Sequence, residues 1–484
     1  MIKSKEIYLD YASATPIERE VIEVIHKSLK EDFANPSAIH KNGVQVKNKL
    51  EKAREEIAEI LGVHMDEIVF TSSATESNNL AILGIVKKFT ELFLEMHTYS
   101  PAGELLCSAR QPAQGISKNT RRTFLLPHIV TTNIEHPAVL EVCKYLEETK
   151  LAEVTYVAVE KNGIVDPKKI KNALKENTIL VSVMYANNEI GTIQPIMEIA
   201  KEIRHYRKAK TESFSNGLAE SAKQTKEDRG PEKNLLTLRS LPFFHTDATQ
   251  AINYLPIKVE KLGVDLMSFN GSKIYGPKGT GVLFIKRNIL INSISFGGEQ
   301  ELGLRPGTEN VANILGLAEA LKITEKVKEK ETARLIKLRD YFIKELFNLQ
   351  NQNKKFSRVL GLGPDQLENL YFDFVINGDS KNRLPNNVNI TIPQIPSDLL
   401  LLELSARGIY VSEKSACKSG DKASSYVINA LNGNKIKAKK ICTKKDMENN
   451  SLRFSLGRGT TKADIDYTLK ALSEILTKLK KWYN

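Results

Sequence analysis

The sequence predicts an α/β protein whose larger part is a mostly parallel sheet. Strand-like runs at Val154–Val159 and Ile179–Met184 flank a helical pattern at Asp166–Glu176, and this order favours parallel strands whose carboxyl ends bind ligands. The chain has 484 residues, of which 41% are hydrophobic and 26% are charged, as in a globular protein long enough for two domains. We expect a large domain over residues 14–320 and a smaller α+β domain formed by residues 1–13 and 321–484.

Helical and extended patterns alternate along the chain. Apolar spacing predicts helices over Glu18–Leu29 and Val44–Leu61, and Gly62 is expected to end the second of them. A strand at Glu67–Phe70 leads into a helix that begins near Glu76. Further strands are expected within Ile7–Pro16, His128–Thr132 and Asn387–Ile392, and helical patterns follow Glu309 to about Leu349.

Small hydroxyl residues at Thr71–Thr75 lie directly before the helix near Glu76. The free amides of a helix N-terminus bind phosphate groups, and the hydroxyls add further donors. The same residues also make an ordinary helix cap, so alone they leave both interpretations open.

Two polar residues follow apolar runs in the centre of the chain. Asp247 comes after Leu241–Phe244, and a carboxylate at the end of a buried strand needs a partner. Lys273 comes after Leu266–Phe269, among apolar and small neighbours that favour a neutral, nucleophilic amine. A carboxylate for a protonated ring nitrogen and an amine for an aldehyde are the pair that pyridoxal phosphate requires. Alone, Lys273 also fits a lysine that reaches solvent from a strand end.

Ten segments, in this order, resemble the cysteine desulfurase family, in the branch that supplies sulfur for iron–sulfur clusters and tRNA thiolation. They span nearly the whole chain: YLDYASATP (8–16), FANPSAIH (33–40), IVFTSSATESNNLAI (68–82), IEHPAVL (134–140), NNEIGTIQPI (187–196), HTDATQ (245–250), LMSFNGSKIYGPKGTG (266–281), GGEQELGLRPGTEN (297–310), SACKSG (415–420) and SLRFSLGRGTT (451–461). The resemblance implies a fold-type I pyridoxal phosphate transferase that converts L-cysteine to L-alanine. It also implies a homodimer that passes sulfur to an acceptor protein, either a cluster scaffold or a tRNA-thiolation enzyme.

The resemblance assigns roles to residues by their positions in these segments. Lys273 would carry the cofactor, His136 would lie against the cofactor ring and transfer protons, and Cys417 would accept sulfur as a persulfide. Arg453 and Asn188 would hold the substrate carboxylate. The other implied cofactor contacts are Ala74, Thr75, Asn188, Asp247, Gln250, Asn270, Ser272 and Thr308, of which Thr308 lies with Arg305 in a loop expected to reach the other subunit.

Without the resemblance, some of these residues have simpler explanations. A lone histidine such as His136 is more often structural, and Arg453 would suit a salt bridge at the start of a strand. Cys417 differs, because Lys414 and Lys418 lie close to it in a polar segment and favour a reactive thiolate. A structural cysteine prefers apolar surroundings.

Two residues before Lys273 depart from the family's pattern. Ser272 stands where the family usually has a histidine, and Asn270 replaces a serine. Both remain hydrogen-bond donors, so the change concerns cofactor affinity more than cofactor identity.

Four segments resemble insertions relative to the family, at about 98–123, 208–240, 350–386 and 432–450. The second is polar and poor in large apolar residues, which is typical of a disordered or extended loop. The fourth is rich in lysine, which indicates a solvated face more often than a docking site for an acidic partner or tRNA.

Composition limits the other classes of function. No stretch approaches the roughly 20 apolar residues of a membrane span, and the N-terminus lacks an apolar signal core, so we expect a soluble cytoplasmic protein. The net charge is +12, but the lysines are dispersed among acids, which argues against direct nucleic-acid binding. The four cysteines lack metal-ligand spacing. The alternatives are a selenocysteine lyase or related aminotransferase, and a non-catalytic scaffold.

Overall fold

The structure is a computed structural model that describes residues 6–98, 126–221, 241–359, 374–392, 395–413, 425–432 and 451–483. Its largest element is a seven-stranded, mostly parallel sheet, which confirms the expected α/β class. Neighbouring strands follow the order β2 (Ile68–Thr71), β8 (Gly281–Ile285), β7 (Leu266–Asn270), β6 (Phe243–Asp247), β5 (Thr178–Ser182), β3 (His128–Thr132) and β4 (Glu153–Val157). Strand β8 runs in the direction opposite to that of the other strands of this sheet.

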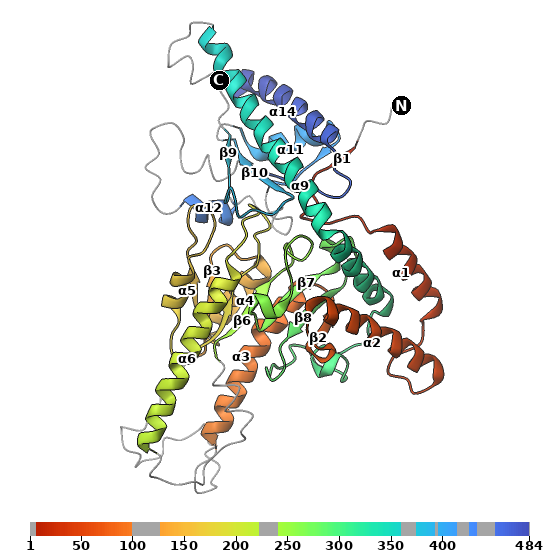
Figure 1. Cartoon of the computed structure of the whole chain (residues 1–484), viewed down its shortest axis with the longest axis vertical. Helices are drawn as coiled ribbons and strands as arrows, with labels where there is room; N and C mark the ends of the chain where they lie inside the picture. The colour runs from red at the N-terminus through yellow and green to blue at the C-terminus, as the bar shows by residue number, and fades with distance from the viewer. Residues whose placement is uncertain are drawn as a thin grey trace.

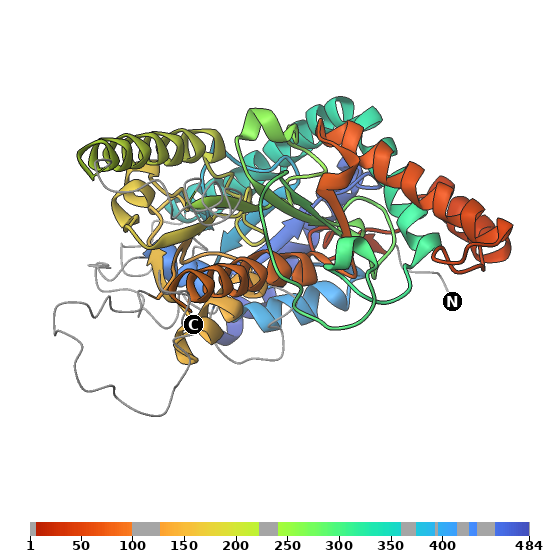
Figure 2. The ribbon, with the colours of Figure 1, turned by 90° about the horizontal axis from the view of Figure 1, so that it is seen from below.

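Helices cover both faces of the large sheet. All residues of β5 and β6 are buried, as expected for parallel strands that are covered on both sides. Figure 2 shows α3 (Ala74–Thr98) on one side of the strands and α6 (Ile196–Ser221) on the other. The shorter helices α4 (Pro137–Glu148), α5 (Pro167–Ala173) and α8 (Val259–Leu262) pack against these two.

A smaller antiparallel sheet lies toward the other end of the molecule (Figure 1). It consists of β12 (Ser451–Ser455), β10 (Asn387–Thr391) and β9 (Val375–Ile376). Strand β1 (Ile7–Tyr8) pairs in parallel with β11 (Ile409–Tyr410), so the N-terminal segment joins the C-terminal part of the fold. The helices of this part are α11 (Ser397–Ser405), α12 (Tyr426–Asn432) and α14 (Lys462–Tyr483).

Helix α9 (Val311–Val359) extends past both sheets (Figure 1). It packs against α1 (Arg19–Glu31) and α2 (Lys41–Leu61) at one end and against α14 at the other. As the sequence predicts, α2 ends at Gly62, which adopts a left-handed conformation with a φ of 72° that costs glycine little.

The region of residues 208–240 differs from the expectation of a loop. Helix α6 continues to Ser221, so residues 208–221 are helical and the prediction for them was wrong. Lysine, glutamate and alanine favour helices, and extending an existing helix is far easier than starting one. The rest of this segment, and most of the segments at 98–123 and 432–450, lie outside the described residues, as do residues 360–373 of the 350–386 segment.

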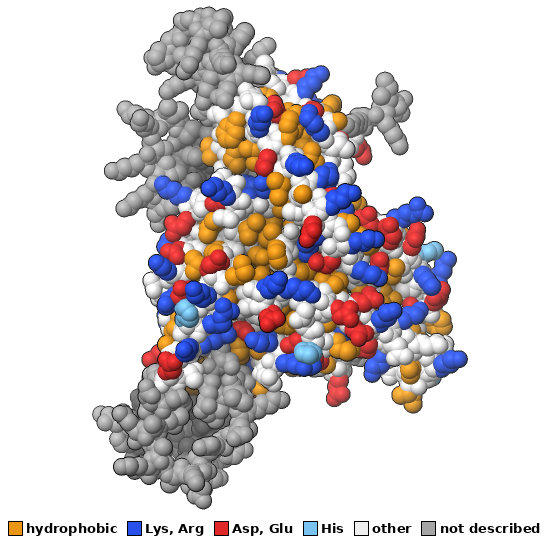
Figure 3. Space-filling view, in the orientation of Figure 1, with side chains coloured by type: hydrophobic (Ala, Val, Ile, Leu, Met, Phe, Trp, Pro, Cys, Tyr) orange, Lys and Arg blue, Asp and Glu red, His pale blue; other side chains and the backbone are white. Residues whose placement is uncertain are grey.

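Helix hydropathy and the distribution of surface charge bear on the class of function. In the described part of the chain, no helix is long and apolar enough to cross a membrane. Figure 3 shows basic and acidic side chains interspersed over the described part of the face in view.

Candidate active site

A cavity of about 150 Å³ lies at the carboxyl ends of strands β2, β3, β5, β6 and β7. This is the edge at which the β-α-β order predicts ligand binding. The lining residues are Ala12, Ser13, Ala74, Thr75, Asn78, His136, Met184, Ala186, Asn188, Asp247, Thr249, Gln250, Asn270, Lys273 and Arg453. Nine of the residues expected from the sequence therefore meet in one place, namely Ala74, Thr75, His136, Asn188, Asp247, Gln250, Asn270, Lys273 and Arg453.

Asp247 is the last residue of β6, and its carboxylate is held from two sides. Asn78 Nδ2 donates to Asp247 Oδ2 at 2.7 Å, and the Thr249 amide donates to Oδ1 at 2.9 Å. These bonds fix the direction of the carboxylate at the cavity wall. Sequence reasoning missed Asn78, although it lies three and four residues after Thr75 and Ala74 and so shares their face of α3.

Lys273 follows β7 through the short 3₁₀ turn Gly271–Lys273. Its Nζ donates a hydrogen bond to the backbone carbonyl of Ser13. The turn is tight, since a Cβ added at Gly271 would lie 2.7 Å from the carbonyl oxygen of Pro277. The backbone of Ser272 is fixed by Thr15, whose amide and hydroxyl both donate to the Ser272 carbonyl at 3.0 and 3.1 Å.

His136 forms the N-cap of α4, where Nδ1 accepts a hydrogen bond from the Ala138 amide at 3.2 Å. A neutral ring whose Nδ1 accepts must carry its proton on Nε2. The preceding residue, Glu135, is fully buried, and its carboxyl accepts from Thr132 Oγ1 at 2.6 Å and from the Met184 amide at 2.9 Å. Burial raises the pKa of Glu135 to about 8. In the sequence, only its place beside His136 distinguishes Glu135.

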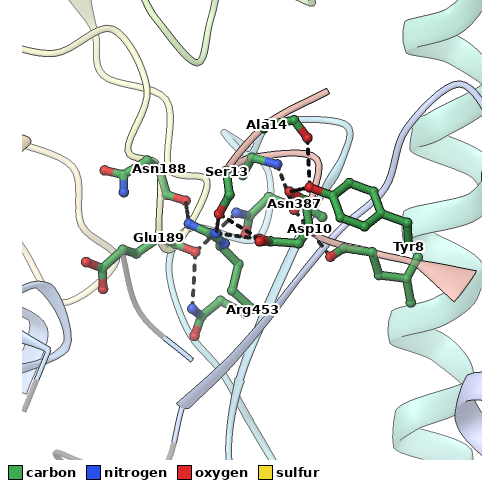
Figure 4. Close-up of polar contacts among 12 residues, drawn as sticks. Tyr8, Asp10, Ser13, Ala14, Asn188, Glu189, Asn387 and Arg453 are labelled. Atoms are coloured by element: carbon green, nitrogen blue, oxygen red, sulfur yellow. Dashed lines mark hydrogen bonds and ion pairs between the residues drawn. The ribbon is translucent and has the colours of Figure 1, made fainter. Parts of the chain in front are cut away.

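Arg453 lies in the middle of β12 with only 1% of its side chain exposed. Its Nη2 donates to Asp10 Oδ1 and to Ser13 Oγ, both at 2.7 Å, and Nη1 donates to the Asn188 carbonyl at 3.0 Å. Figure 4 shows these groups around the guanidinium. Arg453 and Asn188, which were both expected to hold the substrate carboxylate, are thus in direct contact, whereas the contacts with Asp10 and Ser13 were not expected.

Several buried polar atoms at this cavity have no hydrogen-bond partner among the described residues. They are Asn78 Oδ1, Asn188 Oδ1, Thr249 Oγ1 and Arg453 Nε. Buried polar groups in proteins are usually paired. Their concentration at the cavity indicates that it is built for a polar ligand.

Three expected site residues do not line the cavity. Ser272 lies just outside it, with Oγ at 3.4 Å from Asn270 Oδ1. Thr308 lies on an exposed loop, where the neighbouring Arg305 forms an ion pair with Glu76 of the same chain at 3.1 Å. Cys417 lies outside the described residues.

The described residues on either side of the Cys417 segment are anchored beside the cavity. Ser412 exchanges two backbone hydrogen bonds with Arg453, at 2.6 and 3.2 Å. The chain is described again from Ser425, whose Oγ donates to the buried carboxylate of Glu189 at 2.6 Å. The described residues Ser412 and Ser425 therefore lie next to Arg453 and Glu189, respectively.

Comparison with known proteins agrees with this geometry. The family model for aminotransferase class V matches residues 7–94, 119–211 and 241–357. A cysteine desulfurase IscS of Dictyoglomus turgidum is 37% identical over 476 residues, which cover 98% of this chain and 96% of the relative. A cysteine desulfurase IscS of Methanosarcina thermophila is 35% identical over 478 residues, which cover 99% of this chain and 94% of the relative. A solved structure of a NifS-like protein has a TM-score of 0.72 at 29% identity, and the match covers 98% of this chain and 100% of that chain. The chain therefore belongs to the class-V aminotransferase family, in the group of the cysteine desulfurases.

Proposed function

We propose that this protein is a pyridoxal phosphate-dependent cysteine desulfurase that converts L-cysteine to L-alanine. The observation that carries the proposal is the meeting of Asp247, Lys273 and Arg453 at one cavity. These supply a carboxylate for a protonated ring nitrogen, an amine for an aldehyde and a guanidinium for a substrate carboxylate.

The residues at the cavity fit this cofactor. Asp247 holds a fixed carboxylate at the wall, and Ala74 and Thr75 present the first turn of α3, whose amides suit a phosphate group. Thr249 Oγ1 and Asn78 Oδ1 are buried and have no partner among the described residues. When bound, pyridoxal phosphate draws electrons from the amino acid Cα and weakens the bonds at that atom and its neighbour.

The chain's own residues divide the remaining tasks. Arg453 and Asn188 bind the carboxylate of L-cysteine and orient its Cα toward Lys273. The Nζ of Lys273 removes the Cα proton and, while it holds that proton as an ammonium, can donate to the Ser13 carbonyl. His136 is placed to exchange the proton of the substrate thiol through Nε2, because its Nδ1 is engaged by the Ala138 amide.

Cys417 is proposed as the residue that accepts the sulfur as a persulfide. Support comes from Ser412 and Ser425, the described residues before and after its segment, which contact Arg453 and Glu189. The persulfide sulfur would then pass to an acceptor protein, either a scaffold for iron–sulfur clusters or a tRNA-thiolation enzyme.

A homodimer is part of the proposal, with Thr308 contacting the phosphate site of the second subunit. Large apolar side chains are exposed near this loop, with Ile39 at 98% and Phe296 at 95% of their accessible surface. A second cavity of about 490 Å³ joins the Pro36–Ser37 region to Leu302 of the loop. Exposed apolar side chains and a cavity lined in part by this loop suit contact with another copy of the chain.

The test is to measure alanine and protein persulfide formed from L-cysteine by the purified protein with added pyridoxal phosphate. Wild type should form both products, and Cys417→Ser should lose them. Cys442→Ser is the matched control and should behave as wild type. If wild type forms no alanine, the proposed activity is wrong; if Cys417→Ser keeps full activity, another group accepts the sulfur.

A further inference from the structure

The segment Asp10–Thr15, here called the N-terminal turn, contacts three functional side chains of the cavity. Its Ser13 carbonyl accepts from Lys273 Nζ, and its Ala12 carbonyl accepts from Gln250 Nε2 at 2.9 Å. Asp10 and the Ser13 hydroxyl both contact Arg453. The turn therefore connects the lysine, which comes from the large sheet, with the arginine of the small sheet.

Asp10 pairs with Arg453 without lining the cavity. Ser13 and Arg453 line the cavity, whereas Asp10 does not. The Asp10 side chain is 20% exposed and lies 2.7 Å from Nη2 of Arg453, which is 1% exposed. A ligand in the cavity would thus meet the guanidinium and the Ser13 hydroxyl, while Asp10 contacts the same guanidinium without lining the cavity. Figure 4 shows Asp10 and Ser13 beside Arg453.

The position of Asp10 is fixed by its surroundings. The Tyr8 hydroxyl donates to the carbonyls of Asp10 and Ala14 at 3.0 and 2.9 Å, and the Ala12 amide donates to Ser455 Oγ at 2.9 Å. The Ser13 hydroxyl also donates to Asp10 Oδ1 at 2.9 Å. Because the turn is tied to β12, which carries Arg453, Asp10 keeps its place beside the guanidinium when a ligand enters.

We propose that Asp10 is a built-in counter-ion that neutralises Arg453 and thereby weakens the binding of the substrate carboxylate. The incoming carboxylate takes Arg453 Nε, which has no partner among the described residues, and replaces the Ser13 hydroxyl at Nη2. Asp10 remains on Nη2 throughout. This inference rests on the proposed function, in which Arg453 binds the carboxylate of L-cysteine.

The physical basis is the repulsion between two carboxylates that share one guanidinium. A buried cation without a counter-ion is costly and binds an anion strongly, whereas a neutralised pair gains much less from a second anion. Weak ground-state binding suits an enzyme, because binding substrate and transition state equally well does not raise kcat. Asp10→Asn keeps a hydrogen-bond acceptor near Nη2 and removes only the charge.

The test measures binding of 3-mercaptopropionate, a thiol carboxylate without the amine, to the purified full-length protein carrying its cofactor, by calorimetry. Asp10→Asn should bind it about tenfold more tightly than wild type, as loss of one like-charge repulsion at a partly exposed pair implies. The uncharged 3-mercaptopropionamide should show no such gain. Glu18→Gln is the matched control, because Glu18 forms a comparable ion pair with Arg458 at 3.0 Å and does not line the cavity.

Weaker binding of 3-mercaptopropionate to Asp10→Asn than to wild type would overturn the proposal and make Asp10 a residue that only orients Arg453. If Asp10→Asn does not fold, the binding of 3-mercaptopropionate to Ser13→Ala is measured instead. This variant should bind the probe at least as tightly as wild type. Tenfold weaker binding would overturn the proposed replacement of the Ser13 hydroxyl by the ligand carboxylate at Nη2. These readouts do not require turnover. Failure of wild type to form alanine would reject the proposed activity alone, and an active wild type with no gain in Asp10→Asn would reject this inference alone.

Discussion

Glu135 makes the stability of the fold depend on pH in a direction opposite to that of most carboxylates. Burial raises its pKa from the usual 4.5 to about 8, so between these pH values the folded state holds a proton that the unfolded state has lost. Stability therefore falls as the pH rises through this window. At 1.36 kcal/mol per pH unit the full effect is about 5 kcal/mol. For a chain of 484 residues this corresponds to a fall in Tm of roughly 5 °C.

Glu135→Gln imitates the protonated carboxyl and removes its titration. The new amide can donate to Thr132 Oγ1 and accept from the Met184 amide, which are the two present partners. Thermal unfolding of the variant and wild type should give similar Tm values at pH 5, and the variant should be more stable by roughly 5 °C at pH 9. Glu148→Gln is the control, because the Glu148 side chain is 66% exposed. A difference between Glu135→Gln and wild type that stays constant from pH 5 to pH 9 would refute the reasoning.

Three further predictions follow from contacts at and behind the cavity. Asn78→Ala removes a donor to Asp247 Oδ2 and should raise the dissociation constant for pyridoxal phosphate about tenfold in an absorbance titration, a loss in the range of one hydrogen bond to a charged group. Asn79→Ala, at a half-buried neighbour that does not line the cavity, should leave that constant unchanged. Burial lowers the pKa of His245 to about 4, so the folded state binds fewer protons than the unfolded state below about pH 6.5, and stability falls as the pH drops toward 4. The free energy of unfolding, followed by circular dichroism, should therefore fall less steeply between pH 6.5 and 4 in His245→Gln than in wild type. An equal slope in the two proteins would contradict this. Gly191→Ala should lower stability by more than about 1 kcal/mol, because Gly191 has a φ of 72° and an added Cβ would lie 2.6 Å from the Cβ of Asn387. Gly279→Ala has a φ of 76° with nothing within 4 Å and should cost less in urea unfolding; equal losses would remove the steric part of the argument.

The sequence predicted those parts of the fold that depend on local pattern. Buried apolar runs ending in Asp247 and just before Lys273 are visible in the sequence, and both lead to the cavity because parallel strands end at the same edge. The family segments also indicated His136, Asn188 and Arg453, whose positions at the cavity the structure then provided.

The remaining site residues act through partners that are distant in the chain. Asp10 meets Arg453 across 443 positions, and Asn78 meets Asp247 across 169 positions, so no local pattern announces either contact. Glu135 is distinguished only by complete burial, which depends on the assembled sheet. The extension of α6 was missed for another reason, since polar composition was taken as the sign of a loop although the same residues favour helix when a helix is already formed.

The most direct test of the central claim is alanine formation from L-cysteine by Lys273→Ala. Lys278→Ala, at an exposed position five residues along the same segment, is the matched control. With added pyridoxal phosphate, wild type and Lys278→Ala should form alanine at similar rates, and Lys273→Ala should form none above the rate without protein. Alanine formation by Lys273→Ala at the wild-type rate would contradict the account, because the amine that lines the cavity together with Asp247 would then have no part in the reaction.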